Sequence, residues 1–175
     1  RPVRTPHGPT RARQVGNAGD GRHAAIAPPA AEAWAAETEG IPIGLTGVTD
    51  PASSGLVDTN EAPGGNVTGS SDLTPVAEQI DLLQQILPEA KTVGILYCSA
   101  ESNSEIQAQL AHEACEAAGL TAVDYTVSTS NDIQTVVESM VGNGDAIYAP
   151  TDNIIAAGMP TVAMIANENK LPIIA

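Results

Sequence analysis

The chain has 175 residues, of which 42% are hydrophobic and 16% charged, a composition typical of a soluble globular protein. Aromatic residues make up only 2%, so the core must be built from Ala, Val, Ile and Leu, as in proteins that pack helices on parallel sheets. The formal charge is -14, and after His23 two lysines stand against twenty acidic residues. This charge disfavours nucleic acids and anionic membrane surfaces as partners.

Residues 1–23 differ from the rest of the chain in charge and composition. They are rich in Arg, Pro and Gly, show no apolar periodicity, and hold five of the seven basic residues. This composition predicts a segment that is disordered or unrelated to the remainder of the chain. Cys98 and Cys115 are too few for a disulfide framework or a zinc site, and we expect no metal or cofactor.

Residues 24–73 predict a helix, a strand and a long loop. An Ala-rich stretch at 28–40 ends at a glycine, which is typical of a helix terminus. The apolar residues 41–45 then predict a short buried strand. Residues 50–69 are rich in Gly, Pro and Asn, and a loop of this length is typically functional.

From residue 72 onward, predicted helices and strands alternate. Thr74 is expected to cap the first helix with Pro75 at its first position, and Ser104 and Gln107 are expected to form a capping box at the second. The predicted helices are 72–88, 104–119, 131–142 and 159–170, and the predicted strands are 92–97, 121–127, 145–149 and 171–175. Such alternation indicates right-handed crossovers, and therefore a doubly wound α/β unit with a parallel sheet.

Polar clusters come directly after three predicted strands, at residues 46–51, 99–104 and 151–153. In open parallel sheets ligands bind beyond the carboxyl ends of the strands, where helix N-termini favour anions. Asp50 and Asp152 could accept hydrogen bonds from an ammonium group, so the set suits a zwitterion such as an amino acid. Each cluster alone is equally compatible with helix capping, and their recurrence favours a binding site.

Enzyme signatures are weak. The chain has no Walker A loop and no GxSxG motif, and the sequence HEACE at 112–116 lacks the second histidine of a zinc protease. Nothing orients Cys98 and His112 as a nucleophile and its base. We therefore expect no enzymatic activity and no catalytic residues.

Six strings in the second part of the chain occur in the order of a known family: LTGVTDP, APGGNVTGSSDLTP, ILPEAKTVGILY, AESNS, AIYAPTDN and LPIIA. Residues 24–175 resemble the ABC-transporter substrate-binding proteins of the tryptophan/tyrosine type. The resemblance implies a periplasmic-binding-protein-like α/β fold, in which two lobes with parallel doubly wound sheets close on a small solute. Residues 24–73 would be the C-terminal part of the first lobe with the crossing segment, and residues 74–175 a second lobe truncated at its C-terminal end. On this resemblance both lobes would be incomplete and the chain would be an internal fragment.

The resemblance also implies which residues bind the solute. The implied ligand-binding residues are, on the first lobe, Thr46, Thr49, Asp50, Ser71 and Asp72, and on the second, Glu101, Asn103, Ser104, Thr151, Asp152 and Asn153. The sequence departs from the family pattern at Cys98, Ser99, Ala100 and Ser102. On this assignment we expect Asp152→Ala to abolish solute binding with little loss of stability.

The implied function is that of a solute receptor for an ABC importer, which captures an amino acid of aromatic type or a related compound. Its partners would be the solute and an ABC permease, and its location periplasmic or extracytoplasmic, lipid-anchored or soluble. A sensor domain of a transcription regulator shares the two-lobe fold and is one alternative. A flavodoxin-like or hydrolase enzyme is another, disfavoured by the missing phosphate loop and nucleophile elbow.

Overall fold

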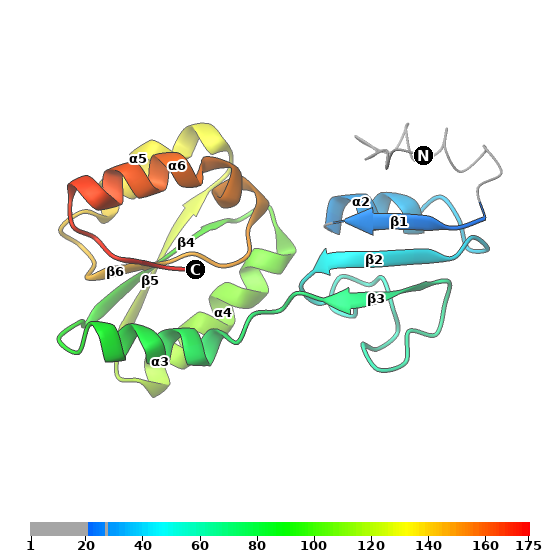
Figure 1. Ribbon diagram of the computed structural model, residues 1–175, viewed down its shortest axis with the longest axis horizontal. Helices are drawn as coiled ribbons and strands as arrows, with labels where there is room; N and C mark the ends of the chain where they lie inside the picture. The colour runs from blue at the N-terminus through cyan, green and yellow to red at the C-terminus, as the bar shows by residue number, and fades with distance from the viewer. Residues whose placement is uncertain (1–20, 27) are drawn as a thin grey trace. The chain divides into compact units, whose positions relative to one another are not determined.

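The computed structural model describes residues 21–26 and 28–175, shown in Figure 1. They divide into two compact units, which we call the N-terminal unit, ending at Leu73, and the C-terminal unit, Thr74–Ala175. Each unit contains one parallel sheet with helices packed on it, which confirms the predicted α/β class. Most of the segment 1–23, expected to be disordered or unrelated, lies outside the described residues.

The N-terminal unit is a three-stranded parallel sheet in the order β1-β2-β3. Its elements are β1 (His23–Ile26), α2 (Pro28–Ala35), β2 (Ile43–Val48) and β3 (Val67–Ser71). Buried and exposed residues alternate along β1 and β2. The buried ones pack with Ala31 and Trp34 of α2, so the helix covers one face of the sheet.

Two strands of this unit were not fully predicted. β1 begins at His23, inside the segment 1–23, and β3 begins within the stretch 50–69 that we expected to be a loop and continues to Ser71. Val67 is the one buried residue of β3. A strand with one buried position gives no alternation in the sequence, which is why the pattern did not reveal it.

Two glycines shape the carboxyl ends of β2 and β3. Gly47 has a φ of 66°, and the register between the strands shifts between Leu45 and Val48. A Cβ atom at Gly69 would lie 1.9 Å from the carbonyl oxygen of Leu45. The close approach leaves Val48 paired with Ser71, so the two strand ends lie next to each other.

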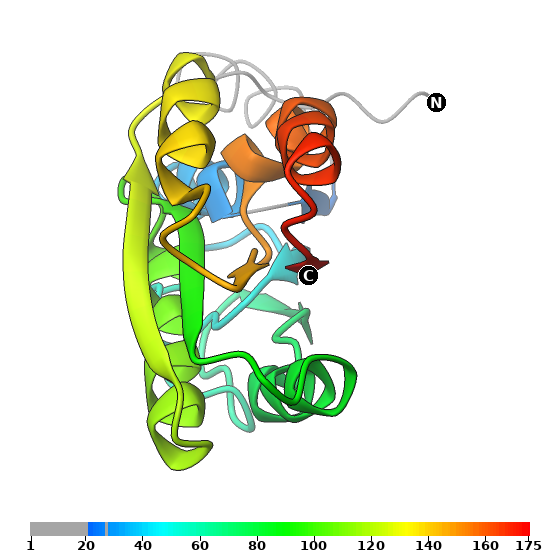
Figure 2. The ribbon, with the colours of Figure 1, turned by 90° about the vertical axis from the view of Figure 1, so that its left-hand side faces the viewer.

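The C-terminal unit is a four-stranded parallel sheet in the order β5-β4-β6-β7, whose strands lie side by side in Figure 2. Its elements are α3 (Val76–Ile86), β4 (Thr92–Cys98), α4 (Ser102–Ala117), β5 (Thr121–Val127), the 3-10 turn η1 (Ser130–Asp132), α5 (Ile133–Met140), β6 (Ala146–Tyr148), α6 (Asn153–Glu168) and β7 (Ile173–Ile174). α5 and α6 cover one face of the sheet and α3 and α4 the other (Figure 1). The predicted doubly wound arrangement is therefore confirmed.

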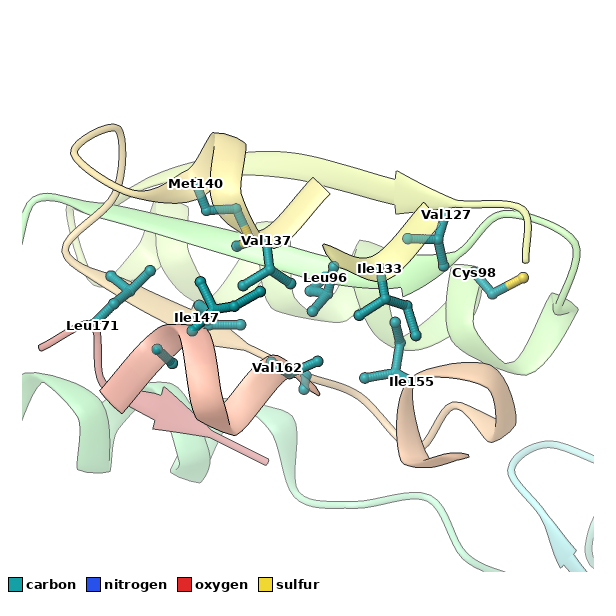
Figure 3. Packing of buried hydrophobic residues seen from close by; sticks show 13 residues of the cluster. Leu96, Cys98, Val127, Ile133, Val137, Met140, Ile147, Ile155, Val162 and Leu171 are labelled. Carbon is teal, nitrogen blue, oxygen red and sulfur yellow. The ribbon is translucent and has the colours of Figure 1, made fainter. Parts of the chain in front are cut away.

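Alternate residues of the central strands supply the two cores of this unit. Leu96 and Ile147 face α5 and α6, where they pack with Ile133, Val137 and Val162 (Figure 3). The residues of the opposite face pack against α3 and α4; these are Val93, Ile95, Ala146 and Tyr148. Strands buried on both faces read as continuous apolar runs, which is the pattern the sequence shows.

The order of the strands creates a reversal between β4 and β6. From β4 the chain passes through α4 to β5 on one side, and it then returns through α5 to β6 on the other side of β4. At such a switch point the connections diverge, and ligands of open α/β sheets bind beyond the carboxyl ends of these strands. The two loops after β4 and β6 are therefore the expected place for a site in this unit.

Three predicted helix starts are wrong. α3 begins after Pro75 without a side-chain cap, and the hydroxyl of Thr74 instead faces Gln79 and Gln107. α4 begins at Ser102, so Ser104 and Gln107 lie inside the helix rather than in a capping box. α6 begins at Asn153 rather than at 159, so Pro160 lies within it, and its cap is Asp152, which confirms helix capping by the cluster 151–153. Tertiary hydrogen bonds compete with local capping for these polar side chains.

Within the part of the chain that the structure describes, no helix combines the length and the hydropathy needed to cross a bilayer. Over the same residues three basic side chains, Arg22, Lys91 and Lys170, stand against twenty acidic ones. None of these three basic side chains forms a salt bridge with a described acidic residue, and the contact between His112 Nε2 and Asp124 Oδ1, at 2.8 Å, is a hydrogen bond. Like-charge repulsion at low ionic strength therefore opposes the compact state.

We predict that salt stabilises the protein. Raising NaCl from about 0.01 M to about 1 M shortens the Debye length from about 30 Å to about 3 Å and screens this repulsion. Thermal unfolding should be measured on the intact protein, meaning this chain with whatever coding sequence flanks it in its source genome. The unfolding midpoint should rise by several degrees, mostly below about 0.15 M, where the Debye length is already about 8 Å. A midpoint that falls or stays constant over this range would contradict the prediction.

Candidate functional site

The carboxylate of Asp152 joins three segments at the switch point of the C-terminal unit. Oδ1 accepts a hydrogen bond from the backbone N–H of Ile155 at 2.8 Å and so caps α6. Oδ2 accepts from the backbone N–H of Cys98 at the end of β4 and from the hydroxyl of Ser104 in α4, both at 2.7 Å. Asp152 is 3% exposed. It is the one buried carboxylate among the described residues, and its oxygens are engaged within the protein.

A second carboxylate occupies the same helix start. Glu101 accepts hydrogen bonds from the backbone N–H groups of Asn153, at 3.1 Å, and Ile154, at 3.2 Å, and from the Asn153 side chain at 2.7 Å. Ile155 is bonded to Asp152, and Ala156 donates to the carbonyl of Asp152. The N–H groups of the first three residues of α6 are thus paired within the protein, and that of Ala156 makes the first regular helix bond, so none of these groups is free for an anion.

The start of α4 differs from that of α6. Its first two N–H groups, those of Ser102 and Asn103, have no hydrogen-bond acceptor among the described residues. The next N–H, of Ser104, donates to the carbonyl oxygen of Glu101 at 3.1 Å. Free N–H groups and the helix dipole give α4 the capacity for an anionic group that α6 lacks.

The six predicted site residues of the C-terminal unit come together at the carboxyl ends of β4 and β6, but they divide by burial. Thr151 and Asn153 are exposed, and Glu101 is partly exposed. The other three predicted site residues, Asn103, Ser104 and Asp152, are buried. The amide of Asn103 donates to the carbonyl of Thr151 at 3.0 Å. The buried residues therefore hold the loops after β4 and β6 in place through hydrogen bonds. The exposed residues are available to a ligand.

In the N-terminal unit, Asp50 organises the loop after β2. Its carboxylate accepts hydrogen bonds from the Ser53 hydroxyl at 2.7 Å, from the Asn60 amide at 2.9 Å, and from the backbone N–H groups of Ala52 and Ser53. The Ser53 hydroxyl, followed by the Asn60 amide, lowers the pKa of Asp50. Asn60, ten residues downstream, escaped the sequence analysis because no local pattern links it to Asp50.

The other predicted residues of this unit line the adjacent strand ends. Thr49 is buried, and its carbonyl accepts a hydrogen bond from the Ser71 hydroxyl. Thr46 Oγ1 lies 3.4 Å from the Oγ of Ser70, a residue that the sequence analysis missed. Asp72 is exposed, and its carboxylate accepts no hydrogen bond from a described residue. Asp72 is thus the free carboxylate of this group.

Among the described residues, no basic side chain follows the carboxyl end of a strand in either sheet. Arg22, Lys91 and Lys170 precede β1, β4 and β7, so they lie toward the amino ends of the strands. No group of three His, Cys, Asp or Glu side chains in the described part of the chain could hold a metal ion. The candidate site therefore consists of hydroxyls, amides, backbone N–H groups and carboxylates.

The expectation that Asp152 can be removed with little loss of stability conflicts with its burial. We predict that Asp152→Ala lowers the free energy of unfolding by about 2–5 kcal/mol, because it removes a helix cap and leaves buried donors unpaired. Asp145→Ala is the matched control: Asp145 also accepts two backbone N–H bonds, from Lys91 and Thr92, but is exposed. Urea unfolding of the intact protein measures both, and an equally small effect of the two changes would contradict the structural role of Asp152.

The sequence and the fold of this chain are similar to those of known proteins. The family model for ABC transporter substrate binding proteins matches residues 11–175, and the match extends into the segment expected to be unrelated. The tyrosine-binding protein of Clostridioides difficile (strain R20291) is 42% identical over 151 residues, which are 86% of this chain and 44% of that protein.

Two solved structures have the same fold. The ABC domain from Streptococcus pneumonia in complex with L-Trp matches with a TM-score of 0.90 and 39% identity, over 94% of this chain and 57% of that one. A conserved domain protein from Vibrio cholerae matches with a TM-score of 0.90 and 35% identity, over 94% and 56% of the two chains. This chain spans about half the length of these relatives. With the family model matching nearly its whole length, the chain belongs to the ABC transporter substrate-binding protein family.

Proposed function

We propose that the protein is the solute receptor of an ABC importer and that it binds an α-amino acid with an aromatic side chain. The relatives support this reading, since one is named for tyrosine binding and another is a complex with L-Trp. Family membership favours a transport protein over an enzyme. The proposal concerns the whole protein, which acts outside the cytoplasm and delivers its solute to an ABC permease.

The main support for the proposal is that some polar groups at the strand ends have no hydrogen-bond partner among the described residues. At the start of α4 the N–H groups of Ser102 and Asn103 are free of described acceptors, which suits a solute carboxylate. Asp72 offers a free carboxylate, which suits a solute ammonium group. Thr151 and Asn153 add exposed polar groups. Each unit by itself thus presents free polar groups at its own strand ends, of kinds that a zwitterion needs.

The charge at the strand ends favours an amino acid over a simple carboxylic acid. A solute with a carboxylate and no ammonium group would meet neutral donors, while Glu101, Asp152 and Asp72 contribute negative charge to the two sets of strand ends. The three described basic groups lie toward the amino ends of the strands and do not offset this charge. Like charges oppose binding, which favours a solute that also carries an ammonium group.

A panel of related solutes tests the proposal by thermal unfolding of the intact protein. L-tryptophan and L-tyrosine should raise the midpoint by several degrees, because a ligand at 100 times its Kd stabilises by about 2.7 kcal/mol. Tryptamine, which lacks the carboxylate, should bind more weakly, and indole-3-propionate, which lacks the ammonium group, should have no effect. Stabilisation by the acid would contradict the charge argument, and no shift with any amino acid would overturn the receptor proposal.

Asp72→Asn should weaken binding of L-tyrosine about 10- to 100-fold and leave the free energy of unfolding unchanged. The substitution removes the charge from a hydrogen bond to an ammonium group, and charged hydrogen bonds contribute about 1.5–3 kcal/mol. Glu39→Gln is the control, because Glu39 is an exposed carboxylate just before the amino end of β2. Titration calorimetry measures both variants, and equal affinities would remove Asp72 from the site.

A further inference from the structure

Gln107 is a buried amide in the second turn of α4, with no exposed surface. Its Nε2 has two protons to donate and lies within hydrogen-bond distance of three acceptors, which are the hydroxyl of Thr151, the carbonyl of Asn103 at 3.2 Å and the carbonyl of Thr151 at 3.4 Å. Its Oε1 accepts from the backbone N–H of Thr151 at 3.2 Å. The amide thus holds both backbone polar groups and the side chain of Thr151, much as a neighbouring strand would hold a residue in a sheet.

The same amide also meets the first residue of the C-terminal unit. Thr74 Oγ1 lies 3.3 Å from Gln107 Oε1 and 3.2 Å from Gln79 Oε1, and the hydroxyl of Tyr148 donates to Gln79 at 3.1 Å. The hydroxyl of Thr74 has one proton to donate, so it serves one glutamine at a time. Thr74 comes directly after Leu73 at the end of the N-terminal unit, and Gln107 thus connects this boundary to the loop after β6.

Packing does not require a glutamine at position 107. The buried residues that follow Gln107 on α4, namely Ala108, Ala111 and Cys115, are small and apolar, while those that precede it, Asn103 and Ser104, are polar. A buried amide carries a desolvation penalty that its hydrogen bonds must offset, and an apolar side chain of similar volume would fill the space without that penalty. The presence of a glutamine at position 107 is therefore explained by its hydrogen bonds to Thr151 and to Thr74.

We propose that Gln107 is a positioning residue for solute binding, which fixes Thr151 in the conformation that meets the solute and links it to Thr74. The inference rests on the proposed function, in which exposed Thr151 contacts the solute. Without the amide, the N–H and the hydroxyl of Thr151 lose their partner on α4, its carbonyl keeps only the hydrogen bond from Asn103, and the loop samples other conformations. The solute then binds to a smaller fraction of molecules, which weakens its apparent affinity.

Gln107→Met in the intact protein tests this, because methionine has a similar volume and cannot donate these hydrogen bonds. Gln84→Met is the matched control, since Gln84 also donates its amide to a carbonyl, that of Ala118 at the far end of α4, at 2.8 Å. We expect Gln107→Met to weaken L-tyrosine binding about tenfold or more and to speed hydrogen exchange at the Thr151 amide by about tenfold. Gln84→Met should leave both within about twofold.

Thr74→Val removes the hydroxyl with little change in shape. It should weaken binding less than Gln107→Met, and the double variant should bind no more weakly than Gln107→Met alone, because the two residues act through one contact. Urea unfolding of each variant separates lost affinity from lost stability. Wild-type affinity in Gln107→Met would overturn the proposal, whatever its stability. If the wild type binds neither tyrosine nor tryptophan, the proposed function fails, while unchanged Thr151 exchange in Gln107→Met would independently refute positioning by Gln107.

Discussion

The buried carboxylate of Asp152 is the interaction on which the C-terminal unit's candidate site depends. It binds the last N–H of β4, a hydroxyl of α4 and an N–H of α6, so the loops on both sides of the strand reversal are joined through one side chain. Glu101 completes the start of α6. Because these carboxylates are engaged with backbone groups, the loops are held before any solute arrives, and the ordering cost of binding is correspondingly smaller.

The acidic residues near the strand ends therefore have two different roles: some bind backbone N–H groups of the loops, and one is free for a solute. Asp50, Glu101 and Asp152 hold backbone N–H groups and shape the loops. Asp72 is free of such bonds in the described part of the chain. The same division appears among the amides, where buried Gln107 supports exposed Thr151. A binding protein needs this combination, in which fixed supports keep a few exposed groups in position for the ligand.

The periodicity of the sequence was sufficient to predict the parallel α/β arrangement and the strand ends where the polar clusters gather, because both result from local pattern and chain connectivity. The roles of individual polar residues were not predictable. Asp152 is bonded to Cys98, 54 residues away, and Gln107 to Thr151, 44 residues away. Ser, Thr, Asp and Gln at such places resemble helix caps locally, so the sequence favoured capping at Thr74 and Ser104 where tertiary partners determine the outcome. β3 was not predicted because it has one buried residue, so its sequence shows no alternation of apolar and polar residues.

Backbone amide NMR spectra of the intact protein, recorded during a titration with L-tyrosine, test the location of the site most directly. Saturable shifts should be concentrated at residues 99–104 and 151–155 of the C-terminal unit and at residues 46–50 and 70–73 of the N-terminal unit, where polar groups lie at the strand ends. Saturable shifts confined to the opposite strand ends, around Lys91 and Lys170, would contradict the assignment of the site to the carboxyl ends of the sheets.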